Sequence, residues 1–138
     1  MEVAMPAAKK APKAVSAPKV ILLVDDEMSV LMLVKKILED SGYAVDAAVS
    51  GEQALRKLRE IRPNLVILDM MMPGLSGLDV CKRIRQTPEW QNLHVMFLTV
   101  MRRTKEVEED LKLLNVSDYV EKPFSVEDLL VRVKAAVS

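Results

Sequence analysis

After residue 19, the pattern of apolar and polar positions alternates between two periods up to the end of the chain. Short apolar runs are typical of strands buried in a sheet, whereas apolar residues three and four positions apart indicate amphipathic helices. The expected strands are VILLV at 20–24, YAVDAAV at 43–49, LVIL at 65–68, HVMFL at 94–98 and DYV at 118–120. Helical spacing follows each of them, and TPEWQN at 87–92 is expected to be a loop.

Small polar residues and glycine mark where these helices should begin and end. Gly42 can end the first helix in the left-handed conformation. Ser50 and Gln53 have the spacing of a capping box ahead of the second helix. Ser76 and Ser125 can cap the third and the last helix. These signals support the helical assignments independently of the apolar spacing.

Alternating strands and helices, with several strands apolar throughout, predict a doubly wound α/β fold whose parallel sheet is covered on both faces. With 138 residues, half of them hydrophobic, the chain is long enough for one domain with a real core. We place this domain at residues 19–138. Residues 1–18 mix Ala, Pro and Lys without a sustained period, which favours a flexible arm.

Charge and cysteine usage narrow the functional classes. The 20 basic and 20 acidic residues cancel, so the total charge points neither to nucleic acid nor to a membrane surface. A single cysteine, Cys81, cannot form an internal disulfide and is expected in the core of a protein from a reducing compartment. No apolar run approaches the ~20 residues of a membrane helix. These features predict a cytoplasmic protein.

Polar side chains follow four of the expected strands. Asp25 and Asp26 come after the first strand, Asp69 after the third, Thr99 after the fourth and Lys122 after the fifth. In a parallel sheet these strand ends meet at one edge, where α/β proteins bind ligands. Three neighbouring carboxylates need a cation, and an all-oxygen site suits Mg²⁺. A carboxylate beside Mg²⁺, a lysine and a threonine hydroxyl is suited to accept a phosphoryl group.

The segments that carry this chemistry resemble the response-regulator receiver domain of two-component signalling. They are ILLVDDE at 21–27, LVILDMMMPGLSGLDV at 65–80, VMFLT at 95–99 and DYVEKPF at 118–124. The resemblance implies a flavodoxin-like fold with strand order 2-1-3-4-5. It also implies that Asp69 is the phosphoacceptor, and that Asp25, Asp26, Asp69 and the backbone carbonyl of Met71 hold Mg²⁺.

The same resemblance implies roles for residues in the last two strands. Thr99 would be the hydroxyl that moves to the phosphoryl group, Tyr119 an aromatic switch and Lys122 the cation that contacts the phosphoryl oxygens. The bond between Lys122 and Pro123 is expected to be cis. The methionine side chains at 70–72 are expected to pack.

The function implied is a phosphorylation-controlled signalling switch. A histidine kinase or phosphotransfer protein would donate to Asp69, and the altered surface would bind a downstream protein as a monomer or a phosphorylation-dependent dimer. One alternative is an atypical receiver that acts as a constitutive scaffold. Another, a Mg²⁺-dependent phosphohydrolase, needs an acid two residues after its nucleophile, where this chain has Met71. We therefore expect no enzyme activity beyond self-phosphorylation and self-dephosphorylation.

A few positions depart from the usual pattern of the family. Val100 follows Thr99 where a small residue is common, and Asn115 stands where glycine often occupies a left-handed position. Met71 and Met101 are apolar where a polar side chain could orient an attacking water. Together with the branched side chain of Val100, which should narrow the approach to Thr99, the two methionines predict slow self-dephosphorylation.

Overall fold

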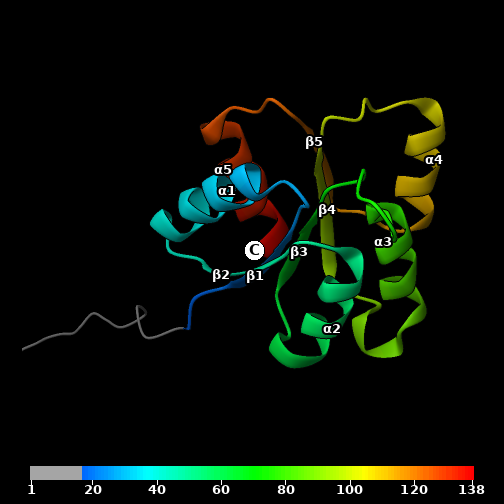
Figure 1. Cartoon of the computed structure of the whole chain (residues 1–138), viewed down its shortest axis with the longest axis horizontal. Helices are drawn as coiled ribbons and strands as arrows, with labels where there is room; N and C mark the ends of the chain where they lie inside the picture. The colour runs from blue at the N-terminus through cyan, green and yellow to red at the C-terminus, as the bar shows by residue number, and fades with distance from the viewer. Residues whose placement is uncertain (1–16) are drawn as a thin grey trace, which may run out of the picture.

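The computed structural model describes residues 17–138, which form one sheet of five parallel strands with five α-helices (Figure 1). The strands are β1 (Val20–Val24), β2 (Ala44–Ala48), β3 (Leu65–Leu68), β4 (His94–Thr99) and β5 (Asp118–Glu121). The helices are α1 (Met28–Asp40), α2 (Gly51–Ile61), α3 (Gly77–Gln86), α4 (Lys105–Leu113) and α5 (Val126–Val137). The strand order is β2-β1-β3-β4-β5, which confirms the expected fold class. Residues 1–16, nearly all of the expected arm, lie outside the described residues.

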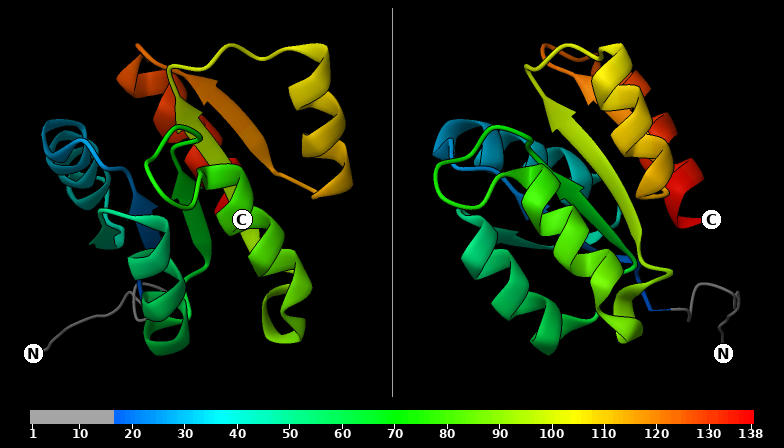
Figure 2. Two further views of the ribbon diagram at one scale, coloured as in Figure 1. Left: turned by 45° about the vertical axis from the view of Figure 1, so that its right-hand side comes forward. Right: turned by 90° about the vertical axis from the view of Figure 1, so that its right-hand side faces the viewer.

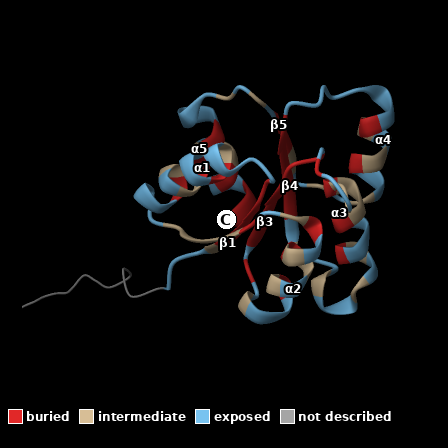
Figure 3. Ribbon diagram, in the orientation of Figure 1, coloured by how far each residue is buried: buried red, intermediate tan, exposed pale blue. Residues whose placement is uncertain are grey.

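The helices cover the two faces of the sheet in separate groups (Figure 2). Side chains of a strand alternate between faces, so Leu22 and Val24 pack toward α2, α3 and α4, while Ile21 and Leu23 pack toward α1 and α5. Figure 3 shows the buried positions concentrated in the strands and on the inward sides of the helices. A sheet buried on both faces explains the continuous apolar runs of β1 and β3.

The N-termini of α2, α3 and α5 are capped by the serines that the sequence indicated. The side chains of Ser76 and Ser125 each accept a hydrogen bond from the backbone three residues on. At α2 the expected capping box is wrong in one half: Ser50 accepts from the Gln53 backbone, but Gln53 Oε1 accepts from the Val49 amide at 2.7 Å. The glutamine side chain is long enough to reach one residue past the cap.

Two features of the chain differ from the sequence-based expectation. Residues Pro88–Trp90 form a short 3₁₀ helix, η2, inside the segment expected to be a loop. Arg62 ends α2 with a φ of 47°, a left-handed conformation that its residue type does not signal. Gly42 and Asn115, by contrast, have the positive φ angles that their types favour.

Within residues 17–138, no helix has the length and hydropathy needed to cross a bilayer.

Candidate functional site

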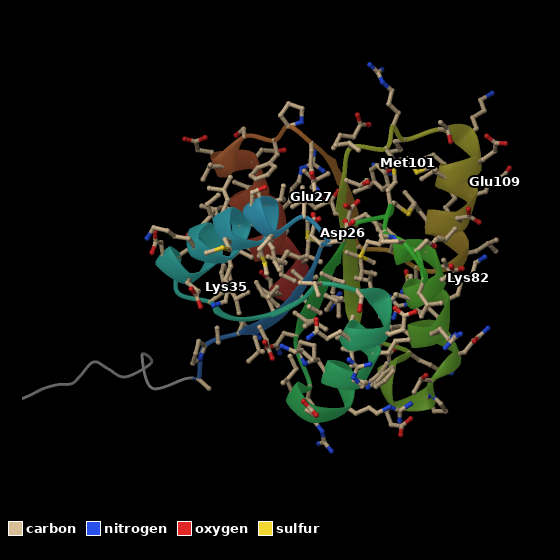
Figure 4. The ribbon with its side chains drawn as sticks, viewed as in Figure 1. Asp26, Glu27, Lys35, Lys82, Met101 and Glu109 are labelled. Carbon is tan, nitrogen blue, oxygen red and sulfur yellow. The ribbon has the colours of Figure 1, made fainter. Side chains whose placement is uncertain are left out.

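The carboxyl edge of the sheet brings the polar strand-end residues together. Backbone hydrogen bonds of the sheet continue one residue past the strands: the Asp69 amide donates to the Val24 carbonyl at 3.0 Å, and the Lys122 amide donates to the Thr99 carbonyl at 2.8 Å. These bonds fix the backbone at Asp69 and Lys122 relative to β1 and β4. Figure 4 shows Asp26 at the end of β1 and Met101 beyond the end of β4, on the same edge.

Three carboxylates form a compact cluster at this edge. Asp25, Asp26 and Asp69 each place one oxygen within 4.8 Å of the others, with Asp25 and Asp69 buried and Asp26 exposed. At this separation each pair of charges repels by about 3 kcal/mol for an effective dielectric of about 20. The cluster is therefore stable only beside positive charge, and its all-oxygen donor set fits a hard cation such as Mg²⁺.

Lys122 supplies one positive charge. Its Nζ lies 2.6 Å from Asp25 Oδ2 and 3.5 Å from Asp69 Oδ2, and its side chain is 9% exposed. Burial opposes the charged ammonium, but the hydrogen bond to Asp25 and the charges of Asp25 and Asp69 outweigh it, so the pKa of Lys122 lies above its ordinary value. The amine is therefore charged at neutral pH and can contact an incoming anion.

The two buried carboxylates are oriented by their own backbone. Asp25 Oδ1 accepts a hydrogen bond from the Glu27 amide at 2.9 Å, and Asp69 Oδ1 accepts one from the Met71 amide at 3.2 Å. This local turn is typical of aspartate and fixes one oxygen of each group. The Oδ2 atoms face Lys122. Asp69 thus holds one carboxylate oxygen against its own loop and turns the other toward the cation.

The loop after β3 depends on Gly77. A Cβ at this position would lie 2.0 Å from the Asp69 carbonyl oxygen, and the Gly77 amide donates to the Met70 carbonyl at 3.0 Å. Only glycine permits this approach. Met70 and Met72 pack in the core as expected, but the expectation is wrong for Met71, which is 58% exposed.

Thr99 and Tyr119 meet through the loop that follows β4. Thr99 is fully buried, and its Oγ1 accepts a hydrogen bond from the Met101 amide at 3.2 Å. The Tyr119 hydroxyl donates to the Met101 carbonyl at 2.7 Å, and the Arg103 guanidinium lies 5.8 Å from the centre of its ring. Burial, with the charge of Glu121, raises the pKa of Tyr119. Both predicted switch side chains therefore hold the same short segment.

The Lys122–Pro123 bond lies at the site, whereas Cys81 and His94 lie away from it. The bond between Lys122 and Pro123 is cis. Cys81 is fully buried on α3, and burial raises the pKa of its thiol to about 11, so it stays protonated at neutral pH. His94 begins β4 at the opposite end of the strand from Thr99. Neither Cys81 nor His94 belongs to the site.

Sequence reasoning missed two contributions to this edge. The sequence alone marks Gly77 only as a glycine in the loop after the third strand, whereas in the structure its lack of a side chain lets the Asp69 carbonyl approach. Arg103 contacts the ring of Tyr119, and its amide donates to Glu121 Oε2 at 3.2 Å. No local pattern marks either role, because both depend on packing between separate elements.

Comparisons with known proteins address the family of this chain. The family model of the response regulator receiver domain matches residues 21–134. The phosphate regulon regulatory protein PhoB of Rhizobium meliloti (strain 1021) is 41% identical over 115 residues, which are 83% of this chain and 50% of that protein. The alkaline phosphatase synthesis regulatory protein PhoP of Bacillus subtilis (strain 168) is 43% identical over 118 residues, 85% of this chain and 48% of that protein.

A solved structure gives the same result for the fold. The chemotaxis protein CheY4 of Vibrio cholerae superimposes with a TM-score of 0.82 at 29% identity, over 87% of this chain and 99% of that one. The chain spans about half the length of the two curated relatives and nearly all of the CheY4 chain. With the matched family model, these likenesses show that the chain belongs to the response regulator receiver domain family.

Proposed function

We propose that Asp69 accepts a phosphoryl group from a histidine kinase or phosphotransfer protein, and that the domain then changes the surface it offers to a downstream protein. Membership of the receiver family supports phosphorylation-controlled signalling. The observation that carries the assignment to Asp69 is its buried carboxylate, packed with two further carboxylates and 3.5 Å from Lys122 Nζ.

In the proposed reaction, an Asp69 carboxylate oxygen attacks the phosphorus of the donor's phosphohistidine. The new O–P bond forms as the N–P bond breaks, and the histidine nitrogen leaves with the electron pair. Lys122 balances the negative charge that arrives beside Asp69. Mg²⁺ held by Asp25, Asp26, Asp69 and the Met71 carbonyl would neutralise charge on the phosphoryl oxygens. The aspartyl phosphate is the product, and no external substrate is turned over.

The response would pass through Thr99 and Tyr119. Thr99 Oγ1 accepts a hydrogen bond from the Met101 amide, and its proton is available for a phosphoryl oxygen. A shift of this hydroxyl removes one of the two bonds that hold Met101, leaving the bond from Tyr119. The segment 100–104, exposed along its whole length, would then rearrange. A cytoplasmic location is part of this proposal.

Phosphoprotein mass spectrometry with acetyl phosphate and Mg²⁺ tests the assignment. The wild-type chain should gain one phosphoryl group, and Asp69→Asn should gain none. Asp40→Asn, an exposed aspartate at the end of α1, is the matched control and should label like the wild type. Labelling of the Asp69→Asn variant would disprove the acceptor. If the wild type gains no phosphoryl group from either acetyl phosphate or a histidine kinase, a constitutive scaffold is the better-supported function.

A further inference from the structure

The C-terminal end of α4 is held by one side chain from α3. Arg85 Nε donates to the Leu114 carbonyl at 2.7 Å, and its Nη2 donates to the Asn115 carbonyl at 3.2 Å. The same guanidinium donates through Nη1 to the Trp90 and Gln91 carbonyls at 3.1 and 3.2 Å. Carbonyls at helix ends lack partners within the helix, and the planar guanidinium can serve several at once. Arg85 thus joins the ends of α4 and η2 to α3.

The opposite end of α4 is held through the proposed switch residues. Met101, four residues before the helix, is bonded to Thr99 through its amide and to Tyr119 through its carbonyl. Arg103 forms an ion pair with Glu108 in the first half of the helix. Because Met101, Arg103 and the residues between Thr99 and α4 are exposed, a change at Thr99 can reach α4 without repacking the core.

One side of α4 borders open space along the helix and past its C-terminal end. Val107 and Leu111 are the buried residues of the helix. Figure 3 shows most of α4 coloured as exposed or intermediate. A hollow of about 340 Å³ lies beside the helix. Its lining residues are Arg103, Glu108, Leu111, Lys112, Asn115 and Val116. Few packed side chains and an adjacent hollow are features of a segment with low local stability.

We propose that Arg85 is a positioning residue that pins the C-terminal end of α4 to α3, so that α4 turns about this end when Thr99 and Tyr119 rearrange. This inference rests on the proposed function, because phosphorylation of Asp69 is what moves the other end. Leu113, 83% exposed, lies next to the pinned end. A partner that contacts Leu113 meets one surface in both states, whereas a partner at the N-terminal half of α4 distinguishes them.

Hydrogen exchange measured by mass spectrometry on the full chain tests the anchor without any ligand. Arg85→Met keeps the aliphatic stem and removes all donors, and should speed exchange of the amides at 112–116 at least tenfold while β3 amides stay unchanged. Arg85→Lys keeps the positive charge but lacks the planar guanidinium. Its exchange rates at 112–116 should lie between those of the wild type and Arg85→Met. Arg83→Met is the control, because Arg83 is exposed on the same helix. If the amides at 112–116 exchange at the wild-type rate in both Arg85 variants, Arg85 does not anchor α4.

The turning of α4 is tested by adding Mg²⁺ and beryllofluoride. In the wild type, exchange should change at 99–106 and stay constant at 112–116, and in Arg85→Met the change should extend to 112–116. A purely structural role would leave the spread of the response unaltered. Equal changes at both ends in the wild type would refute the turning. Absence of any beryllofluoride response in the wild type would instead overturn the proposed function, while ligand-free exchange still decides whether Arg85 anchors α4.

Discussion

Helices α3 and α4 lie on the same face of the sheet but are attached to it very differently. In α3, Val80, Cys81 and Ile84 are fully buried, and Ser76 and Asp79 exchange hydrogen bonds in a complete capping box. Helix α4 keeps only two buried side chains and borders a hollow. Figure 4 shows Lys82 of α3 and Glu109 of α4 both directed away from the sheet. The number of buried side chains on the inner face of a surface helix therefore decides whether the helix is held rigidly or can move.

The difference has a functional meaning within the proposed switch. Helix α3 begins where Gly77 contacts the Asp69 carbonyl, so this helix holds the phosphoacceptor loop in place. Helix α4 follows the loop held by Thr99 and Tyr119, where a response must be transmitted. Precise placement of a reacting group needs tight packing, whereas a conformational response needs a segment that can move at a small cost in free energy.

The largest expected contrast is in core truncation. Ile84→Ala on α3 should lower the free energy of unfolding by about 4 kcal/mol, because the fully packed site cannot collapse around the missing atoms. Leu111→Ala on α4 should cost only about 2 kcal/mol, because the hollow beside it already reduces its contacts. Urea unfolding measures both. Equal costs would show that α4 is packed as tightly as α3.

Overfilling the start of α3 should cost nearly as much. Gly77→Ala places a Cβ against the Asp69 carbonyl and should destabilise the fold by about 3 kcal/mol, with a parallel loss of phosphorylation by acetyl phosphate. Gly42→Ala is the control: no atom lies within 4 Å of its Cβ, so only the left-handed backbone cost of about 1 kcal/mol applies. If Gly77→Ala is phosphorylated normally, the close packing of α3 against the Asp69 carbonyl is not required for the reaction at Asp69.

The buried thiol of α3 should make stability depend on alkaline pH. Burial raises the pKa of Cys81 from an ordinary 9.0 to about 11, against the opposing charge of Arg85. The stabilisation is complete below pH 9 and is lost as pH rises toward 11, since the unfolded thiol ionises first; the full loss is about 2–3 kcal/mol. Chemical denaturation at pH 8 and pH 11 measures it. Cys81→Ala should show a smaller alkaline loss, and an unchanged loss would contradict a protonated buried thiol.

The smallest expected effect concerns the loop that leads to α4. Val100 and Met101 are 59% and 37% exposed beyond Thr99. The branched side chain of Val100 should narrow the approach of water, and Met101 cannot orient a water by a strong hydrogen bond. Val100→Ala and Met101→Gln should shorten the phosphorylated half-life, by about tenfold if about 1.4 kcal/mol of barrier is removed. The decay of phosphoprotein after donor removal measures this effect. An unchanged half-life in both variants would exclude these side chains from the path of water attack.

Local sequence signals anticipated most of the fold. The runs at 20–24 and 65–68 coincide with β1 and β3, and Ser76 caps α3 as expected. Such signals depend on neighbours within a few residues, which the chain carries wherever it folds. The loop prediction at 87–92 failed for η2, a single turn that begins with Pro88 and in which the Trp90 amide donates to the Thr87 carbonyl at 3.0 Å.

The sequence by itself determined which residues end the strands, and hence that Asp25, Asp69 and Lys122 would share one edge of a parallel sheet. Only the tertiary structure decided how they meet: Lys122 bonds to an aspartate 97 positions away. It also decided that Tyr119 bonds to Met101 and that Arg85 holds the end of α4. Periodicity and capping are properties of short segments, whereas the direction of a side chain and its partners depend on how distant segments pack.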